Sequence, residues 1–274
     1  MVYDCHIHMN EEYDKKEFVK RLEQAGVAGG IVFSPPPAVF GNEKSTAAGV
    51  RENIDKVIDL AKDVAGLYPF YWIDPVDDGA DEQACMAAEA GVAGFKVICC
   101  RHYPQDDRAM KVYRLISKKK LPMLFHSGIL YNPGPSGEFN RPCNFEHLMF
   151  VDGLRFAMAH ISWPWCDELI SVFGKWNSMA HGHKVINSEL YIDTTPGTPA
   201  IYREDAFRKL LTVGYSRITD RIIFGTDASS DYNVDFVKRC ISNDRFIFDK
   251  LNISSEIREK LFHKNLMEFL SVGK

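Results

Sequence analysis

Short apolar runs alternate along the chain with stretches in which apolar residues recur at helical spacing. A short, largely apolar run bounded by turn residues is typical of a buried β-strand. The runs span Val2–His8, Gly30–Ser34, Leu67–Asp74, Val92–Ile98, Pro122–His126, Leu154–His160, Leu190–Thr195 and Arg221–Asp227. The pattern therefore predicts eight strands, each followed by a polar or Pro/Gly-containing junction.

The segments between these runs predict helices. Two apolar stripes have helical spacing, one formed by Phe18, Leu22 and Ala25 and the other by Ile54, Val57, Ile58 and Ala61. Further helices are predicted over Asp81–Ala90, Asp107–Lys118, Cys166–Phe173, Glu204–Val213 and Val234–Ser242. Strand–helix alternation of this kind favours a parallel sheet.

Eight strand–helix units in a chain of 274 residues match the size of a closed (β/α)8 barrel. An open, doubly wound sheet is the alternative, and the number of units favours the barrel. No linker divides the chain, so we expect a single domain over residues 1–274. The long segments Pro35–Ser45 and Tyr131–Pro142 directly follow strands, and in a barrel such loops cover the mouth of the active site.

Composition narrows the classes of partner. The net charge of −4 and the lack of an extended basic run argue against nucleic acid. No stretch approaches about eighteen consecutive apolar residues, so no membrane span is expected. There is no signal-peptide pattern at the N-terminus, and the seven cysteines are an odd number. They are therefore interpreted as reduced thiols of a cytoplasmic protein. A small-molecule substrate is expected, and homo-oligomerisation is left open.

Candidate chemistry begins with two histidines one residue apart. If Val2–His8 is a strand, His6 and His8 point to the same face, with their side chains roughly 7 Å apart at the base. Two imidazoles at that spacing can converge on one cation. Alone, the pair is more often explained as polar residues on a solvated face.

The ends of other predicted strands strengthen the case for a metal. Three runs are apolar until their last residue, and they end in His126, His160 and Asp227, while a fourth run carries Lys96. A barrel brings the carboxyl ends of its strands to one rim. Strands often end in polar residues because loops begin there, but buried imidazoles and carboxylates need partners. One shared cation would satisfy them all.

These residues lie in the motifs DCHIH, LFHSG, MAHIS and IIFGTD, with HKNLMEFL near the C-terminus. In this order they resemble the amidohydrolase superfamily. The similarity is to its amidohydrolase 2 type, the branch that includes aminocarboxymuconate-semialdehyde decarboxylase. The resemblance implies that His6, His8, His126 and Asp227 are metal ligands. It implies that His160 is a further ligand or a catalytic acid–base. Lys96 lies where two-metal members carry a carboxylated lysine.

Three histidines and a carboxylate suit Zn²⁺, with Mn²⁺ or Fe²⁺ as alternatives. One ion is expected, and a binuclear site bridged by a carboxylated Lys96 is the alternative. The cation would lower the pKa of a bound water from 15.7 toward ~7. Asp227 would then accept the proton and His160 would polarise the substrate carbonyl. The predicted reaction is hydrolysis of an amide, ester or lactone.

Two other functions remain open. A non-oxidative decarboxylase would use the same residues on a small carboxylated substrate and would need a cation for the carboxylate. Lys96, Arg101 and Arg141 are candidates for binding substrate, and Trp163 is a candidate pocket wall. Each arginine is also explained as a solvated loop residue, and the tryptophan as packing at the barrel rim. A non-enzymatic barrel with a structural metal is the second alternative.

Two further features were interpreted as structural. His181-Gly182-His183 repeats the spacing of the first pair but precedes the seventh strand. It is therefore predicted to be a surface loop or helix terminus at the other end of the barrel. Cys5 alternates with His6 in the first strand, so it is predicted to pack outward against the helices.

Overall fold

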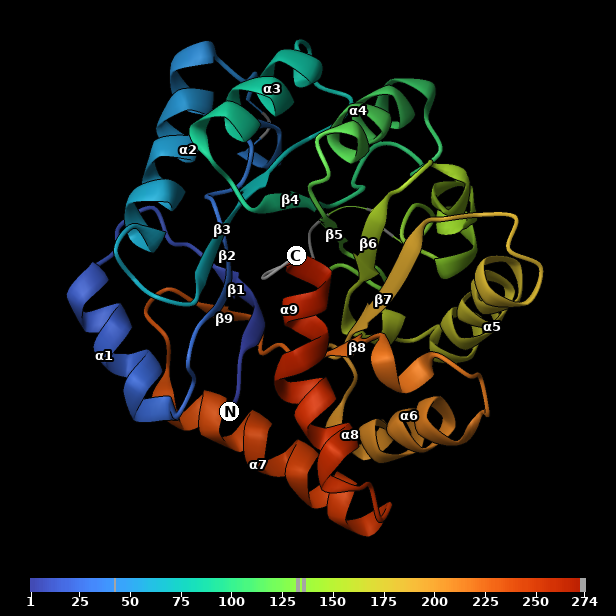
Figure 1. Ribbon diagram of the computed structural model, residues 1–274. Coiled ribbons are helices and arrows are strands. Elements are labelled where there is room, and N and C mark those ends of the chain that lie inside the picture. The colour runs from blue at the N-terminus through green and yellow to red at the C-terminus, as the bar shows by residue number, and fades with distance from the viewer. Residues whose placement is uncertain (42, 132–133, 135–136, 272–274) are drawn as a thin grey trace.

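A computed structural model describes residues 1–41, 43–131, 134 and 137–271. Its strands are all parallel and follow one another around one sheet in chain order, except that β9 lies beside β1 (Figure 1). The strands are β1 (Asp4–His8), β2 (Gly30–Phe33), β3 (Leu67–Trp72), β4 (Gly94–Val97), β5 (Met123–Phe125), β6 (Arg155–Met158), β7 (Glu189–Asp193), β8 (Ile222–Ile223) and β9 (Ala228–Ser229). They match the eight predicted runs, with the eighth run divided into β8 and β9.

The eighth run closes the sheet into a barrel. β8 pairs with β7, and β9 pairs with β1. Between them the Cys5 N–H donates to the carbonyl of Phe224 (N···O 2.8 Å), and the Asp227 N–H donates to the carbonyl of His6 (3.0 Å). The run is divided because Asp227 has a positive φ of 62°, which breaks the regular ladder. The predicted (β/α)8 barrel is confirmed, and an open sheet is excluded.

Helices surround the sheet as Figure 1 shows. They are α1 (Lys15–Ala25), α2 (Ala47–Ala61), α3 (Ala80–Ala90), α4 (Asp107–Lys118), α5 (Cys166–Asn177), α6 (Ala200–Thr212), α7 (Val234–Lys250), α8 (Ser255–Glu259) and α9 (Asn265–Leu270). In α1, the Asp14 side chain accepts from the first backbone N–H groups, and Gly26 ends the helix at φ 74°. Among the described residues, no helix is long and apolar enough to span a membrane.

Helix α7 extends well beyond the predicted end at Ser242. The polar residues near that position indicated a helix end, but Asp244 is buried against α6. Its carboxylate accepts two hydrogen bonds from the guanidinium of Arg203, at 2.6 and 2.8 Å. A paired charge on the inner face therefore interrupts the apolar pattern without ending the helix.

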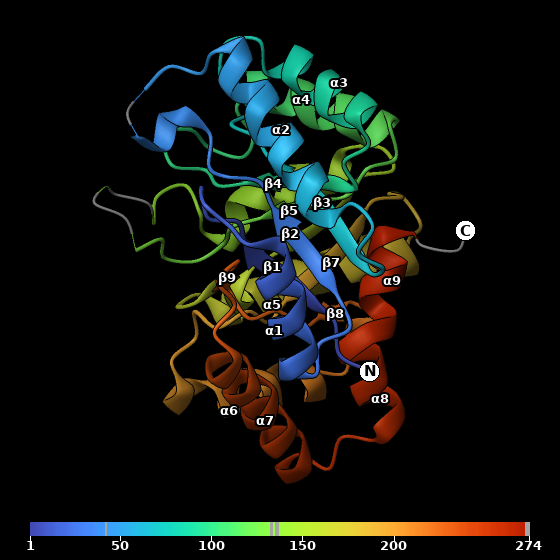
Figure 2. The ribbon, with the colours of Figure 1, turned by 90° about the vertical axis from the view of Figure 1, so that its left-hand side faces the viewer.

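The core has two parts. One lies between the sheet and the helices, and the other fills the barrel interior, where Phe33, Phe70 and Tyr191 meet Leu266 and Phe269 of α9. Figure 2 shows α9 at one end of the barrel, with the described parts of the loops after β2 and β5 at the other. The last helix therefore closes the amino-terminal end and leaves the carboxyl ends of the strands accessible.

The prediction that Cys5 packs outward is wrong. Cys5 is fully buried in the interior cluster with Phe33 and Tyr191. The pairing of β1 with β2 has a bulge between Asp4 and Ile7. The extra residue of a bulge breaks the strict alternation of faces, so Cys5 and its neighbour His6 both face inward. All seven cysteines are free.

Candidate metal centre

Three side chains from the two ends of the sequence meet at the carboxyl end of the barrel. His6 and His8 come from β1, and Asp227 lies between β8 and β9. The two Nε2 atoms are 3.2 Å apart, and they lie 3.4 and 3.3 Å from Asp227 Oδ1. Ligand atoms about 2.1 Å from a tetrahedral ion are separated by about 3.4 Å. The trio therefore fits a divalent cation, and it is the group among the described residues that could hold one.

His126 and His160 follow β5 and β6 and line the same cavity. Their ring centroids are 4.8 Å apart, and that of His160 is 5.2 Å from His6. His126 Nε2 and His160 Nδ1 are buried, and within the described chain neither atom has a hydrogen-bond partner. Such orphaned nitrogens indicate a missing partner such as a cation or substrate. The nitrogens of His126 lie outside the mutual 4.8 Å spacing of the trio.

The backbone is strained at two of these residues. Asp227 and His160 have φ values of 62°, and Ile161 and Ser162 continue the left-handed turn at 47° and 53°. Non-glycine residues rarely occupy this region, and such strain is concentrated at functional sites. Gly197 allows the turn, because a Cβ there would lie 2.9 Å from the Cβ of His160. The turn directs His160 into the cavity instead of along the strand.

Lys96 lies at the base of the site. It comes from β4 and is fully buried, with Nζ 3.3 Å from His6 Nε2. Burial lowers the pKa of Lys96 to about 8. Burial and the charge of Lys96 lower the pKa of His6 to about 3, so this imidazole is neutral. A neutral imidazole is the form that binds a metal.

Asp193, at the end of β7, holds His6 in place. Its Oδ2 lies 2.6 Å from His6 Nδ1, and its other oxygen accepts from the backbone N–H of Thr195 (2.6 Å) and from the Thr195 hydroxyl. Burial opposes ionisation of Asp193, but His6 and Thr195 outweigh it and the pKa falls to about 2. The carboxylate therefore keeps the proton of His6 on Nδ1, so that the Nε2 lone pair is available to a metal.

Asp193 is a site residue that was not predicted from the sequence. A signal was present, because the seventh run ends in polar residues at the same rim as His126, His160 and Asp227.

The second carboxylate of the site, Asp227, has a strongly lowered pKa. Burial raises this pKa, but the surrounding imidazoles lower it by more. Both carboxylates are therefore ionised at neutral pH.

The cavity above these residues has a volume of about 270 Å³. Trp72, from the end of β3, forms part of its wall and was missed by the sequence analysis. Its indole packs against His8, with ring centroids 5.4 Å apart, and against Phe40 at 4.9 Å. The described part of the loop after β5 contributes Tyr131 to the mouth. Positions 42, 132–133 and 135–136 of the predicted loops lie outside the described residues.

Three predicted substrate contacts lie away from this cavity. Arg101 pairs with Asp74 at 2.5 Å, and Arg141 pairs with Glu168 at 2.6 Å. Trp163 stacks on Tyr202 of α6, with ring centroids 4.7 Å apart. None of the three is among the described residues that line the cavity, whereas Lys96 is.

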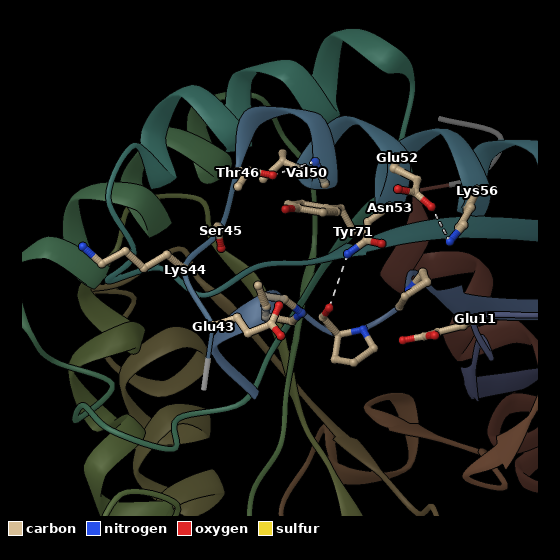
Figure 3. Close-up of a pocket in the computed structure, with 15 residues that line it drawn as sticks. Glu11, Glu43, Lys44, Ser45, Thr46, Val50, Glu52, Asn53, Lys56 and Tyr71 are labelled. Carbon is tan, nitrogen blue, oxygen red and sulfur yellow. Dashed lines mark hydrogen bonds and ion pairs between the residues drawn. The ribbon is translucent and has the colours of Figure 1, made fainter. Parts of the chain in front are cut away.

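A larger cavity of about 340 Å³ lies between the loop after β2 and the start of α2 (Figure 3). Three of its polar side chains already have partners. Lys56 pairs with Glu52 at 2.7 Å, and the Asn53 amide donates to the carbonyl of Pro36 at 3.3 Å. The larger cavity thus lacks side chains that converge on one ligand position.

The second histidine pair lies outside both cavities. His181 and His183 are exposed just after α5, as predicted.

Comparison with known proteins identifies the family and the fold. A family model described as Amidohydrolase matches residues 3–271. An amidohydrolase-like structure from Staphylococcus aureus aligns with a TM-score of 0.65 at 13% identity, covering 99% of each chain. A dihydroorotase from Campylobacter jejuni aligns at 0.61 and 14%, covering 100% of this chain and 84% of that one.

A third structure, a cog1816 amidohydrolase from Burkholderia ambifaria with bound Zn, aligns with a TM-score of 0.54 at 14% identity. The alignment covers 93% of this chain and 67% of that one. At these identities the likeness shows the barrel fold. No curated protein sequence matches this chain.

Proposed function

Because the chain belongs to the amidohydrolase family over residues 3–271, we propose that it is a metal-dependent hydrolase cleaving an amide, ester or lactone of a small molecule. The observation that carries the proposal is the convergence of His6, His8 and Asp227 beneath a cavity lined by histidines without partners. Family membership and fold set the class of enzyme, and the reaction is argued from the site.

One Zn²⁺ held by His6, His8 and Asp227 is the proposed cofactor. His126 is the proposed fourth ligand, and its side chain would have to move toward the trio to bind the ion. Imidazole and carboxylate ligands at this spacing suit zinc, and Mn²⁺ and Fe²⁺ accept the same ligand types. One of the comparison structures has zinc bound. A second ion bridged by a carboxylated Lys96 is the alternative. Electron density for that modified side chain between two ions would replace the one-metal proposal.

A bound divalent cation lowers the pKa of a coordinated water from 15.7 toward ~7, which makes a nucleophile available at neutral pH. Asp227 is ionised, so its carboxylate can accept the proton of the attacking water and return it to the leaving group. His160 has a buried, unpartnered Nδ1 and can donate a hydrogen bond to the carbonyl oxygen under attack. Asp193 keeps His6 in one tautomer throughout.

The arginine contacts favour hydrolysis over decarboxylation. The decarboxylase alternative needs a side-chain cation for the substrate carboxylate. The predicted candidates are Lys96, which lies at the cavity floor, and the two loop arginines, Arg101 and Arg141. Both arginines are held in ion pairs with Asp74 and Glu168 and do not line the cavity. A purely structural metal is disfavoured for another reason, because a structural site has no need of a cavity above its ligands.

The test combines metal content with turnover. Purified protein reconstituted with zinc is expected to hold about one ion per chain and to hydrolyse members of a panel of amides, esters and lactones. The Asp227→Asn variant is expected to lose ~10²–10⁴-fold in kcat, because Asn keeps the shape but cannot accept a proton at neutral pH. Circular dichroism and elemental analysis verify its fold and its metal content.

Asp235→Asn is the matched control, because Asp235 is an exposed carboxylate in the first turn of α7. It is expected to keep wild-type turnover. A folded, zinc-loaded Asp227→Asn protein with near-wild-type turnover would transfer the proton-accepting role to His160 and favour the lyase alternative. Metal content far below one per chain after reconstitution would refute the metal-dependent mechanism.

A further inference from the structure

The walls of the metal-centre cavity differ in chemistry from its floor. The floor consists of the ionisable side chains described above. The walls are formed by apolar and aromatic residues from the ends of β3 and β4 and from the loops after β5 and β7. They are Trp72, Ile98, Ile129, Leu130, Tyr131 and Pro196. A substrate in this cavity therefore meets charge at its deep end and hydrocarbon or aromatic rings around the rest.

Lys96 is the one cationic side chain among the described residues that line the cavity, and it lies at the floor beside His6. The two nearby arginines are paired elsewhere. Among the described residues, no arginine is available on the wall to bind an anionic group of a substrate.

With a divalent cation bound, the formal charges of that ion and of the side chains at the floor sum to one positive charge, which one negative charge on the substrate would neutralise. Lys96 contributes one positive charge, and Asp193 and Asp227 contribute two negative charges. A divalent cation would bring the sum to one positive charge. The oxyanion that develops during attack on a carbonyl balances this charge. A second anionic group on the substrate would be buried against the walls without a partner, which costs several kcal/mol.

We infer that the substrate is a compact, uncharged amide, ester or lactone. Its carbonyl is its main polar group, and the remainder is apolar or aromatic and packs against Trp72. The inference rests on the proposed hydrolase function and names its substrate class. The cavity of about 270 Å³ lies just below the range of about 300–1,000 Å³ typical of drug-sized ligand sites, which fits a small molecule.

The test uses pairs of substrates that differ only by a distal carboxylate. Phenyl acetate is compared with 4-acetoxybenzoate, acetanilide with 4-acetamidobenzoate, and dihydrocoumarin with its ring carboxylate. The zinc-loaded wild-type protein is used, and each kcat/KM is divided by the uncatalysed hydrolysis rate of that compound. The neutral member is expected to exceed the charged member by at least about tenfold, because burial of an unpaired charge costs more than about 1.4 kcal/mol. Equal or better turnover of the carboxylate would overturn the inference.

A variant then places the missing cation on the wall. Tyr131 lines the mouth and is 81% exposed, so Tyr131→Arg is expected to fold. It is expected to raise the relative kcat/KM of the carboxylate members at least fivefold. Phe150→Arg is the matched control for net charge, since Phe150 is exposed and does not line the cavity. An equal effect of both variants, or none from Tyr131→Arg, would count against an uncharged wall.

Failure of the hydrolase proposal gives a separate result. If no pair is hydrolysed, the binding of both members to the zinc-loaded protein is measured by calorimetry. Tighter binding of the neutral members would keep the substrate class while refuting hydrolysis of these bonds. Tighter binding of the carboxylates would overturn the class and support the decarboxylase alternative.

Discussion

At the scale of single residues, the Asp193–His6 contact decides how the site is presented to a metal. The first histidine of the pair is buried, and its Nδ1 is 2.6 Å from the Asp193 carboxylate. A ligand histidine whose second nitrogen is held by a carboxylate keeps one tautomer and one ring orientation. His8 is more exposed, and no carboxylate contact is found at its other ring nitrogen within the described chain. The two histidines would therefore be unequal ligands for the proposed metal, although only one residue separates them.

Replacement of Asp193 is predicted to weaken metal binding. Asp193→Asn can still accept a hydrogen bond from His6 Nδ1 but loses the charge, and a 10–100-fold loss of zinc affinity is expected. Competition with a fluorescent chelator measures the affinity, which needs no substrate. Asp193→Glu is expected to recover part of it. Unchanged affinity in Asp193→Asn would mean that the contact stabilises the barrel without tuning the ligand.

Much of the site could be predicted from residue types at strand ends. His6, His8, Lys96, His126, His160 and Asp227 all line one cavity, although they come from five strands. The rule that the carboxyl ends of barrel strands meet at one rim was sufficient to predict that these side chains lie together. Trp72 was missed because an aromatic residue at the end of an apolar run is indistinguishable from core. The ion pairs of Arg101 with Asp74 and of Arg141 with Glu168 were not predictable, because pairing between loops depends on three-dimensional contacts.

At the scale of elements, the turn after β6 positions His160. Three consecutive residues from His160 to Ser162 adopt positive φ, and the Thr198 hydroxyl donates to the His160 carbonyl at 3.1 Å. The Ser162 hydroxyl lies 2.6 Å from that of Ser127, which follows β5. Contacts from two neighbouring loops therefore maintain a backbone conformation that is unfavourable in isolation.

A methyl group at residue 197 tests the role of this turn. In Gly197→Ala the new Cβ would lie 2.9 Å from the Cβ of His160, so the imidazole must shift. Turnover is expected to fall by at least tenfold, because a displacement of about 1 Å at a catalytic group costs up to 10²-fold. Zinc affinity is expected to change little, because His6, His8 and Asp227 are not displaced. Gly182→Ala is the control for an added methyl group, because a Cβ there would meet only Ser178 Oγ at 3.8 Å.

A large loss of zinc affinity in Gly197→Ala, with turnover restored at saturating zinc, would identify His160 as a ligand instead of an acid–base. Equal losses of turnover in the two glycine variants would indicate a general effect on stability.

Element boundaries were the least predictable feature of the fold. The strand pattern predicted the eighth run as one piece, but the left-handed Asp227 divides it. The bulge in β1 reversed the expected direction of Cys5. Both differences from the prediction occur where an irregular backbone conformation orients a side chain of the site. Hydrophobic periodicity does not reveal such irregularities.

At the scale of the whole molecule, closure of the barrel buries several histidines in an uncharged form. Burial is the main cause that lowers the pKa of His6, His126 and His160, and burial also lowers the pKa of His102 beside Asp74. Because the unfolded chain binds more protons than the folded protein at mildly acid pH, unfolding is coupled to proton uptake.

This coupling predicts that the metal-free protein loses stability in mild acid. In the unfolded chain a histidine binds a proton near pH 6.5, whereas in the folded protein these groups stay neutral to lower pH. Their contribution is thus fully present above pH 6.5 and is lost as the pH falls. Each such histidine adds a slope of up to about 1.4 kcal/mol per pH unit to the free energy of unfolding. Urea denaturation of chelator-treated protein between pH 7.5 and 4.5 measures it.

Two variants separate this effect from general acid lability. His126→Gln removes one buried titrating group, so its slope below pH 6.5 is expected to fall by about one proton. His183→Gln removes an exposed histidine from the loop after α5 and is expected to leave the slope unchanged. A free energy of unfolding that stays constant from pH 7 to pH 5 in the metal-free protein would contradict the prediction. It would mean that the imidazoles take up protons in the folded state, so the site could not present neutral ligands to a metal at those pH values.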